Sequence, residues 1–128
     1  METTSRVISV FGAKGGIGKT FVAVNTAAAL RQTAEIAVVE LDGSGDARSM
    51  LGATPVTYPA EAVTSATLPS IIKKLCEGHA FILIDCRTVI TDTVVTAFEQ
   101  SNLLLLVTTP DAISIRRSQE AIEALTSD

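Results

Sequence analysis

A glycine- and lysine-rich segment near the amino terminus has the residue types that bind phosphate. Residues 13–20 read AKGGIGKT. Glycines accept positive φ angles, so the backbone can curl around an anion with successive N–H groups pointing at it. Lys19 would reach the β- and γ-phosphates of a nucleotide, and the Thr20 hydroxyl would ligate Mg²⁺. The residues that this segment offers to a nucleotide are Lys14, Gly15, Gly16, Ile17, Gly18, Lys19, Thr20 and Phe21.

The alternative is a glycine-rich turn that holds no ligand. The six fixed positions of KGGxGKT coincide by chance in on the order of one chain in 10⁵. The segment also follows a predicted strand and opens a predicted helix, which is the context that a phosphate loop needs. Ala13 replaces the first glycine of the usual pattern, and alanine is compatible with a negative φ there. A phosphate loop is therefore the favoured interpretation, with Lys14 either a second phosphate ligand or a solvated charge.

Acidic residues end two of the predicted strands. Asp85 closes FILID, and Glu40 and Asp42 close VVELD. In a parallel sheet the carboxyl ends of the strands meet at one edge, beside the phosphate loop. Asp85 would hold a magnesium-bound water there, and the alternative for Asp85 is a helix N-cap or a turn. Alternation along the strand puts Glu40 and Asp42 on the same face.

The hydrophobic pattern predicts the scaffold that would position these residues. Strands are expected over 6–11, 35–41, 80–84 and 102–107, and helices over 19–32, 68–76, 92–100 and 113–125. In the third helix Val94, Val95 and Phe98 are expected to point inward, and Asp111 is expected to cap the last helix. Residues 43–59 are rich in Gly, Ser, Thr and Pro and are interpreted mostly as loop. The alternation predicts one α/β domain over 1–128, a doubly wound, mostly parallel sheet with helices on both faces.

Composition narrows the class of protein. Hydrophobic residues make up 47% of the 128 residues and aromatic residues 4%, which suits an aliphatic core around a buried sheet. The net charge of −4 argues against a nucleic-acid surface and leaves only a local basic patch as the alternative. Cys76 and Cys86 lack metal-ligand spacing and are interpreted as reduced core thiols. The start of the chain has no signal-peptide pattern, and no apolar run is long enough to span a bilayer, so we expect a soluble, cytoplasmic protein.

Three segments resemble the ParA/MinD superfamily of deviant phosphate-loop ATPases. They read AKGGIGKTFVAVNTAAAL, VVELDGSGDARSMLGA and LLLLVTTPDAISIRRSQEAI. The G-D pair after Asp42 and the TPD…SIR run most resemble the CpaE/TadZ branch, which acts in pilus assembly and polar localisation. The resemblance implies that Lys14 reaches across an ATP-sandwich homodimer to the partner's nucleotide. It also implies that Asp42 matches the second aspartate of a DxD segment, where it would orient the attacking water or ligate Mg²⁺, with Glu40 replacing the first.

The resemblance implies a function as well as a fold. We expect ATP or ADP with Mg²⁺, slow hydrolysis, and an ATP-dependent dimerisation switch that positions a cellular machine with an unidentified protein partner. It further implies that the predicted strands lie in the order second, third, first, fourth, so that the strand ending at Asp85 neighbours the phosphate-loop strand.

Two departures from the family pattern leave a rival function open. Cys86, Arg87 and Thr88 stand where the family often has proline or glycine after Asp85, and family members usually continue well past 128 residues. The rival is a non-cycling scaffold that keeps the fold but hydrolyses ATP weakly or not at all. The nitrogenase iron protein has a very similar loop, but Cys76 and Cys86 do not fit its cluster-binding segment. No MinD-like amphipathic membrane helix is expected at the carboxyl terminus.

Overall fold

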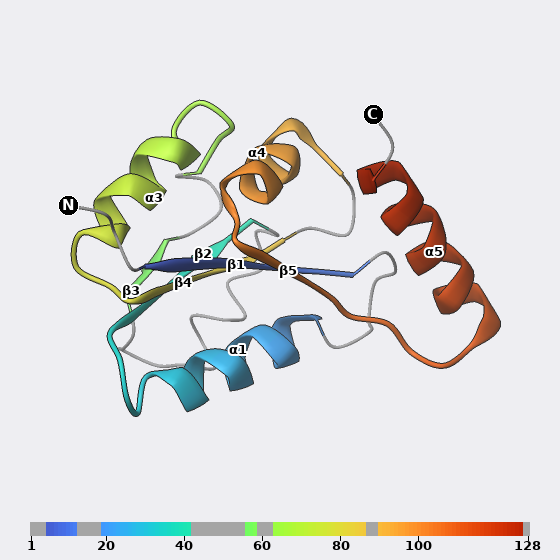
Figure 1. Cartoon of the computed structure of the whole chain (residues 1–128), viewed down its shortest axis with the longest axis horizontal. Coiled ribbons are helices and arrows are strands. Elements are labelled where there is room, and N and C mark those ends of the chain that lie inside the picture. Colours follow the sequence, from blue (N-terminus) through green and yellow to red (C-terminus); the bar gives the residue numbers. More distant parts are fainter. Residues whose placement is uncertain (1–4, 13–18, 42–55, 59–62, 87–89, 127–128) are drawn as a thin grey trace.

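Strands and helices alternate along the chain, with helices on both faces of one sheet (Figure 1). The computed structural model describes residues 5–12, 19–41, 56–58, 63–86 and 90–126. Its elements are β1 (Arg6–Phe11), α1 (Lys19–Leu30), β2 (Ile36–Glu40), β3 (Val56–Tyr58), α3 (Leu68–Cys76), β4 (Phe81–Asp85), α4 (Asp92–Gln100), β5 (Leu103–Leu106) and α5 (Ala112–Thr126). Helix α1 covers one face, and α3 and α4 cover the other. The predicted fold class is confirmed.

The sheet has five parallel strands in the order β3-β2-β4-β1-β5. The four predicted strands therefore lie in the predicted order, second, third, first, fourth. Strand β3 is an addition to the prediction, because residues 43–59 were interpreted mostly as loop and no strand was expected there. Its three residues pair with Ala37–Val39 of β2. A strand this short is stabilised by the open edge of its neighbour rather than by a local sequence pattern.

The core consists of two apolar layers, one on each face of the sheet. Ile82 and Ile84 of β4 belong to the layer under α3 and α4, whereas Leu83 belongs to the layer under α1. All three are fully buried, which explains why the strand reads as an unbroken apolar run. On the α1 side, Ala27 is also fully buried, so the small side chains of this helix bring it close to the sheet.

The helices mostly present the predicted faces. Leu68, Ile72 and Leu75 of α3 are buried, as their spacing predicts. In α4, Val94 is buried, but the inward placement of Val95 is wrong, since its side chain is 43% exposed. Successive helical residues differ by about 100° around the axis, so Val95 turns away when Val94 faces the sheet.

Two further predictions about helix packing can be compared with the structure. Phe98 is half-buried and contacts Phe11 edge-on, with ring centroids 5.4 Å apart. The predicted cap of α5 is confirmed, because a carboxylate oxygen of Asp111 accepts a hydrogen bond from the Ser114 backbone N–H at 2.9 Å.

Among the described residues, no helix has an apolar stretch long enough to cross a membrane.

Candidate nucleotide site at the carboxyl edge of the sheet

The carboxyl ends of four strands meet at one edge of the sheet. Strand β1 ends at Phe11 on this edge and α1 begins at Lys19, while residues 13–18 between them lie outside the described residues. The backbone ladder continues just past the strand ends. The Leu41 N–H donates to the Asp85 carbonyl at 2.8 Å, and the Cys86 N–H donates to the Val10 carbonyl at 3.0 Å. Backbone hydrogen bonds on both sides therefore fix the position of Asp85 relative to β1 and β2.

Two acidic side chains lie next to each other at this edge. Glu40 is the register partner of Asp85, and Val10 is the register partner of Asp85 on the other side. Neighbouring strands are about 4.8 Å apart, so the two carboxylates leave the sheet at closely spaced points. Val38 and Leu83, two residues earlier in each strand, belong to the core layer under α1. Alternation therefore places Glu40 and Asp85 on the α1 face.

Burial distinguishes this pair from ordinary surface acids. The Glu40 side chain is 1% exposed and that of Asp85 is 0% exposed. Charged groups inside a protein are costly unless they are paired or coordinate a metal. Oxygen donors of this kind suit Mg²⁺, which is usually held by one or two carboxylates together with phosphate oxygens and water. The Glu40 and Asp85 pair fits Mg²⁺ bound jointly with a phosphate ligand.

The structure places some of the predicted site residues and not others. Asp85 is the last residue of β4, on the predicted edge. Lys19, Thr20 and Phe21 form the first turn of α1, where backbone N–H groups and the helix dipole favour an anion. The remaining predicted residues lie outside the described residues: Lys14, Gly15, Gly16, Ile17, Gly18 and Asp42.

Glu40 belongs to the candidate site, although the sequence pattern indicates only a substituted position beside Asp42. The structure buries Glu40 and makes it the register partner of Asp85 on the neighbouring strand. The available signal was an acidic residue at the end of an all-apolar strand, since acidic residues are almost never fully buried without a partner.

Both cysteines are free thiols, with Cys86 buried in the layer under α3 and α4 and Cys76 half-buried. Their placement agrees with the interpretation as core thiols.

The segment after β5 also borders this edge. The Val107 N–H donates to the Phe11 carbonyl at 2.8 Å, so residues 108–111 start beside the end of β1. The Thr109 hydroxyl donates to the Asp111 carboxylate and is also hydrogen-bonded to the Ser114 hydroxyl, which ties this turn to the beginning of α5. The edge is therefore bordered by the ends of β2, β4, β1 and β5 together.

Comparison with known proteins agrees with this geometry. A family model described as ParA, NUBPL iron-transfer P-loop NTPase, matches residues 3–76. A curated relative, the maintenance of carboxysome distribution protein A of Gloeobacter kilaueensis, is 31% identical and is matched over 84% of this chain. The match covers 50% of that relative, so the chain spans about half the length of the curated relative.

Solved structures show the same fold. A ParA family ATPase from Chlorobium tepidum superposes with a TM-score of 0.79 at 19% identity, over 94% of this chain and 67% of its own. The septum site-determining protein MinD of Pyrococcus horikoshii, complexed with Mg-ADP, superposes with a TM-score of 0.75 at 21% identity, over 94% of this chain and 65% of its own. The family match over residues 3–76 covers more than half of the 128-residue chain, and the fold and the strand-end geometry agree with it. The chain therefore belongs to the ParA/MinD-type family of P-loop NTPases.

Proposed function

We propose that this chain binds ATP with Mg²⁺ at the carboxyl edge of its sheet and acts as an ATP-dependent dimerisation switch with slow hydrolysis. The observation that carries the proposal is the buried, in-register pair of Glu40 and Asp85, next to the end of β1 and the beginning of α1. The switch would act in the cytoplasm in the positioning of a cellular machine, as the names of the carboxysome-distribution and septum-site relatives suggest. The sequence features of the CpaE/TadZ branch favour a role in pilus or secretion assembly or in partition.

Each residue of the site has a separate role in this proposal. The N–H groups of the phosphate loop and the Lys19 ammonium bind the phosphates, and the Thr20 hydroxyl and Asp85 orient the magnesium ion and its waters. Asp42 orients the attacking water. Lys14 reaches the nucleotide of the second copy, because two facing triphosphates repel each other where water screens poorly. Mg²⁺ supplies charge that stabilises the transferring phosphoryl group.

A non-cycling scaffold is the second candidate, and one observation favours it. The chain leaves β4 through Cys86, which is fully buried in the layer opposite the two carboxylates. The family often places proline or glycine after this aspartate, where the backbone senses the γ-phosphate. Phosphate release measured with ATP and Mg²⁺ separates the candidates, because a scaffold binds ATP without releasing phosphate above the background rate.

Replacing Lys14 by alanine is expected to keep measurable ATP affinity but to remove the ATP-dependent dimer and most hydrolysis. The reason is that Lys19 remains to bind the phosphates in cis, whereas the charge donated across the dimer is gone. Light scattering with a non-hydrolysable ATP analogue measures the dimer for wild type and variant. A variant that still dimerises like wild type in the presence of the analogue would mean that Lys14 is a solvated charge.

Replacing Asp42 by alanine is expected to leave ATP binding within a few-fold of wild type and to slow phosphate release about 10²-fold or more. The attacking water loses its orientation while the phosphate ligands stay in place, so the ATP-bound state accumulates. Single-turnover phosphate release checks the rate, and calorimetric titration checks binding. Hydrolysis at the wild-type rate would make Asp42 a structural residue only.

A further inference from the structure

The middle of β1 contains a buried polar residue in an otherwise apolar strand. Ser9 lies on the same face of β1 as Val7 and Phe11, and its side chain is 0% exposed in the layer under α3 and α4. Its hydroxyl lies 2.6 Å from that of Ser101, the residue that follows the end of α4. The Ser101 hydroxyl in turn donates to the Ala97 carbonyl at 2.6 Å. Because the Ser101 proton is used in that bond, the Ser9 hydroxyl is the one that donates to Ser101.

The next residue along the chain also bonds to β1. The Asn102 N–H donates to the Val7 carbonyl at 2.8 Å, and the Asn102 side-chain Oδ1 accepts from the Val7 N–H at 2.8 Å. If β5 continued backward, a backbone carbonyl would accept from this N–H, but the chain there is helical, since α4 ends at Gln100. The Asn102 side chain supplies that acceptor instead. Helix α4 therefore ends only two residues before the first residue of β5, while both backbone groups of Val7 keep their hydrogen bonds.

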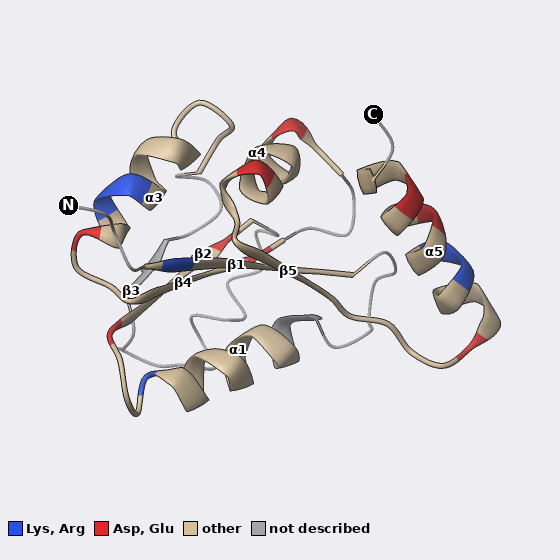
Figure 2. Ribbon diagram, in the orientation of Figure 1, with Lys and Arg blue, Asp and Glu red and all other residues tan. Residues whose placement is uncertain are grey.

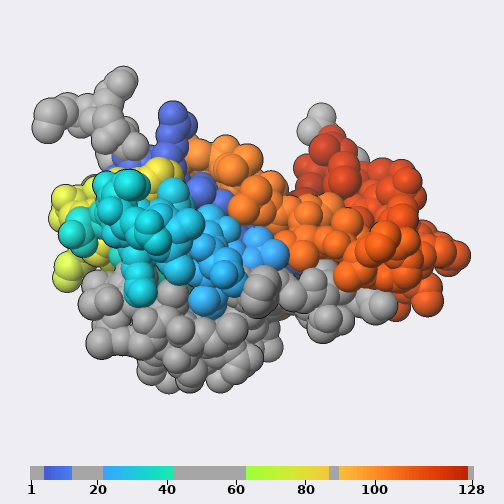
Figure 3. All heavy atoms as spheres, turned by 90° about the horizontal axis from the view of Figure 1, so that it is seen from below, coloured from blue at the N-terminus to red at the C-terminus, as the bar shows by residue number. Residues whose placement is uncertain are grey.

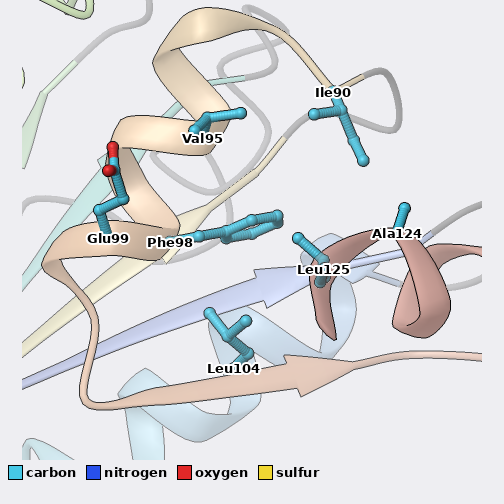
Figure 4. A pocket seen from close by; sticks show the side chains of 7 residues that line it. All are labelled: Ile90, Val95, Phe98, Glu99, Leu104, Ala124 and Leu125. Atoms are coloured by element: carbon cyan, nitrogen blue, oxygen red, sulfur yellow. The ribbon is translucent and has the colours of Figure 1, made fainter. Parts of the chain in front are cut away.

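A third contact lies in the same row along β1. Phe98 of α4 meets Phe11 edge-on, so every second residue from the carboxyl end of β1 toward its amino end contacts the end of α4 or the two residues after it. Figure 4 shows Phe98 and Leu104 pointing into the same apolar space between α4 and β5. In Figure 3 the orange atoms of the β5 region lie beside dark blue atoms of β1. We call Phe98, Ser101 and Asn102 together the β1 clamp.

The β1 clamp contains no charged group. The charged residues of α4 are Asp92 and Glu99, both exposed, and neither α4 nor β5 carries Lys or Arg, as Figure 2 shows. The hydrogen bonds of the clamp are partly buried. Breaking such a bond leaves a buried donor or acceptor without its partner, which costs more than losing an exposed contact. The attachment of α4 to β1 should therefore be strong and insensitive to salt.

We propose that the β1 clamp joins α4 and β1 into one cooperative unit, so that a nucleotide bound at the carboxyl edge stabilises α4 through β1. The inference rests on the proposed function, because it uses nucleotide binding beside the end of β1. A ligand slows the exchange of every amide whose opening also disrupts its site, by the factor one plus ligand concentration over Kd. Amides that open independently keep their rates. Nucleotide occupancy is thereby transmitted to the end of α4 beside Val7, near the amino end of β1.

Amide hydrogen exchange measured by NMR, without nucleotide and with Mg-ADP at about 100 times its Kd, tests this proposal. ADP is the probe because the proposed dimer requires ATP. In wild type, the amides of β1 and of α4 are both expected to slow about 100-fold. In the double variant Ser101→Ala/Asn102→Ala, β1 is expected to keep this slowing, whereas the slowing in α4 falls below about tenfold because α4 then opens without β1.

The chain offers a matched control and a milder variant. The Thr96 hydroxyl also donates to a carbonyl four residues back, that of Asp92 at 2.9 Å, in a bond that stays within α4. Thr96→Ala is therefore expected to leave the slowing in α4 as in wild type. Asn102→Asp keeps an acceptor for the Val7 N–H and is expected to behave like wild type as well. Ser101→Ala alone is expected to lie between wild type and the double variant, and it replaces the double variant if that one does not fold.

The exchange rates of β1 provide an internal reference. If β1 slows in wild type and α4 does not, the two elements open separately and the proposal is overturned. It is also overturned if α4 keeps its full slowing in the double variant, or if Thr96→Ala removes the slowing as completely as the double variant does. If β1 itself does not slow and calorimetry shows no binding of Mg-ADP, the proposed function is overturned together with this inference. The two failures are thus distinguishable.

Discussion

Lys19→Ala is expected to reduce ATP affinity by roughly 30- to several-thousand-fold, which corresponds to a loss of about 2–5 kcal/mol. Lys19 is the first residue of α1 and follows directly on the segment that leaves β1 beside Asp85. In the proposed site its ammonium group pairs with phosphate oxygens where little water competes. Removing one partner of such a pair leaves the other charge poorly compensated, so the loss exceeds that of a surface ion pair.

Isothermal titration calorimetry with ATP and Mg²⁺ measures this loss. Lys73→Ala is the matched control, because Lys73 is exposed on α3 and its replacement removes the same charge away from the carboxyl edge. Its affinity should stay within about twofold of wild type, since surface charges far from a site have small effects. Circular dichroism confirms that both variants fold. Wild-type affinity in the Lys19 variant would remove the phosphate-loop assignment.

Ile84→Ala is expected to lower the free energy of unfolding by about 2–5 kcal/mol, a large part of the 5–15 kcal/mol typical of a domain. Ile84 is fully buried in β4, and its register partners are Ser9 of β1 and Val39 of β2. The replacement removes three carbon atoms from a layer enclosed by the sheet and by α3 and α4. Because strands on both sides hold the backbone, the cavity can collapse only partly.

Urea unfolding without nucleotide measures this change, so that binding does not contribute. Ile113→Ala is the control, since the Ile113 side chain is 56% exposed at the beginning of α5. Its effect should lie within about 0.5 kcal/mol of zero. If the two replacements destabilise the chain equally, the core does not have the layered arrangement around β4 that is described above.

The parts of the fold that sequence alone predicts are those with a strong local pattern. Strand β4 is an unbroken apolar run, and the buried residues of α3 repeat at helical spacing, so both elements follow directly from the residues. Strand β3 has three residues and depends on the edge of β2, and the exposure of Val95 depends on which way α4 rotates against the sheet. Neither is encoded within its own segment.

For the candidate site as well, the sequence predicts the parts that depend on a local pattern and not those that depend on pairing between distant strands. The position of Asp85 at the carboxyl edge follows from a strand that ends in an acid, but its pairing with Glu40 depends on the register of strands 45 residues apart in sequence. Alternation along one strand relates Glu40 to Asp42 and says nothing of its neighbour on β4. The predicted roles of Lys14 and Asp42 stay predictions, because both residues lie outside the described residues.

The central position of β4 in the sheet determines which kind of unfolding exposes its backbone to solvent. The strand is hydrogen-bonded to β1 on one side and β2 on the other, and both of its faces are buried. Its amide protons should exchange with solvent only through global unfolding, whereas those of β5 and α5 should exchange through local openings of much lower free energy. Amide hydrogen exchange measured by NMR would then be slow in β4 and fast in β5 and α5. The strand that carries Asp85 is then expected to keep its geometry during local openings of β5 and α5.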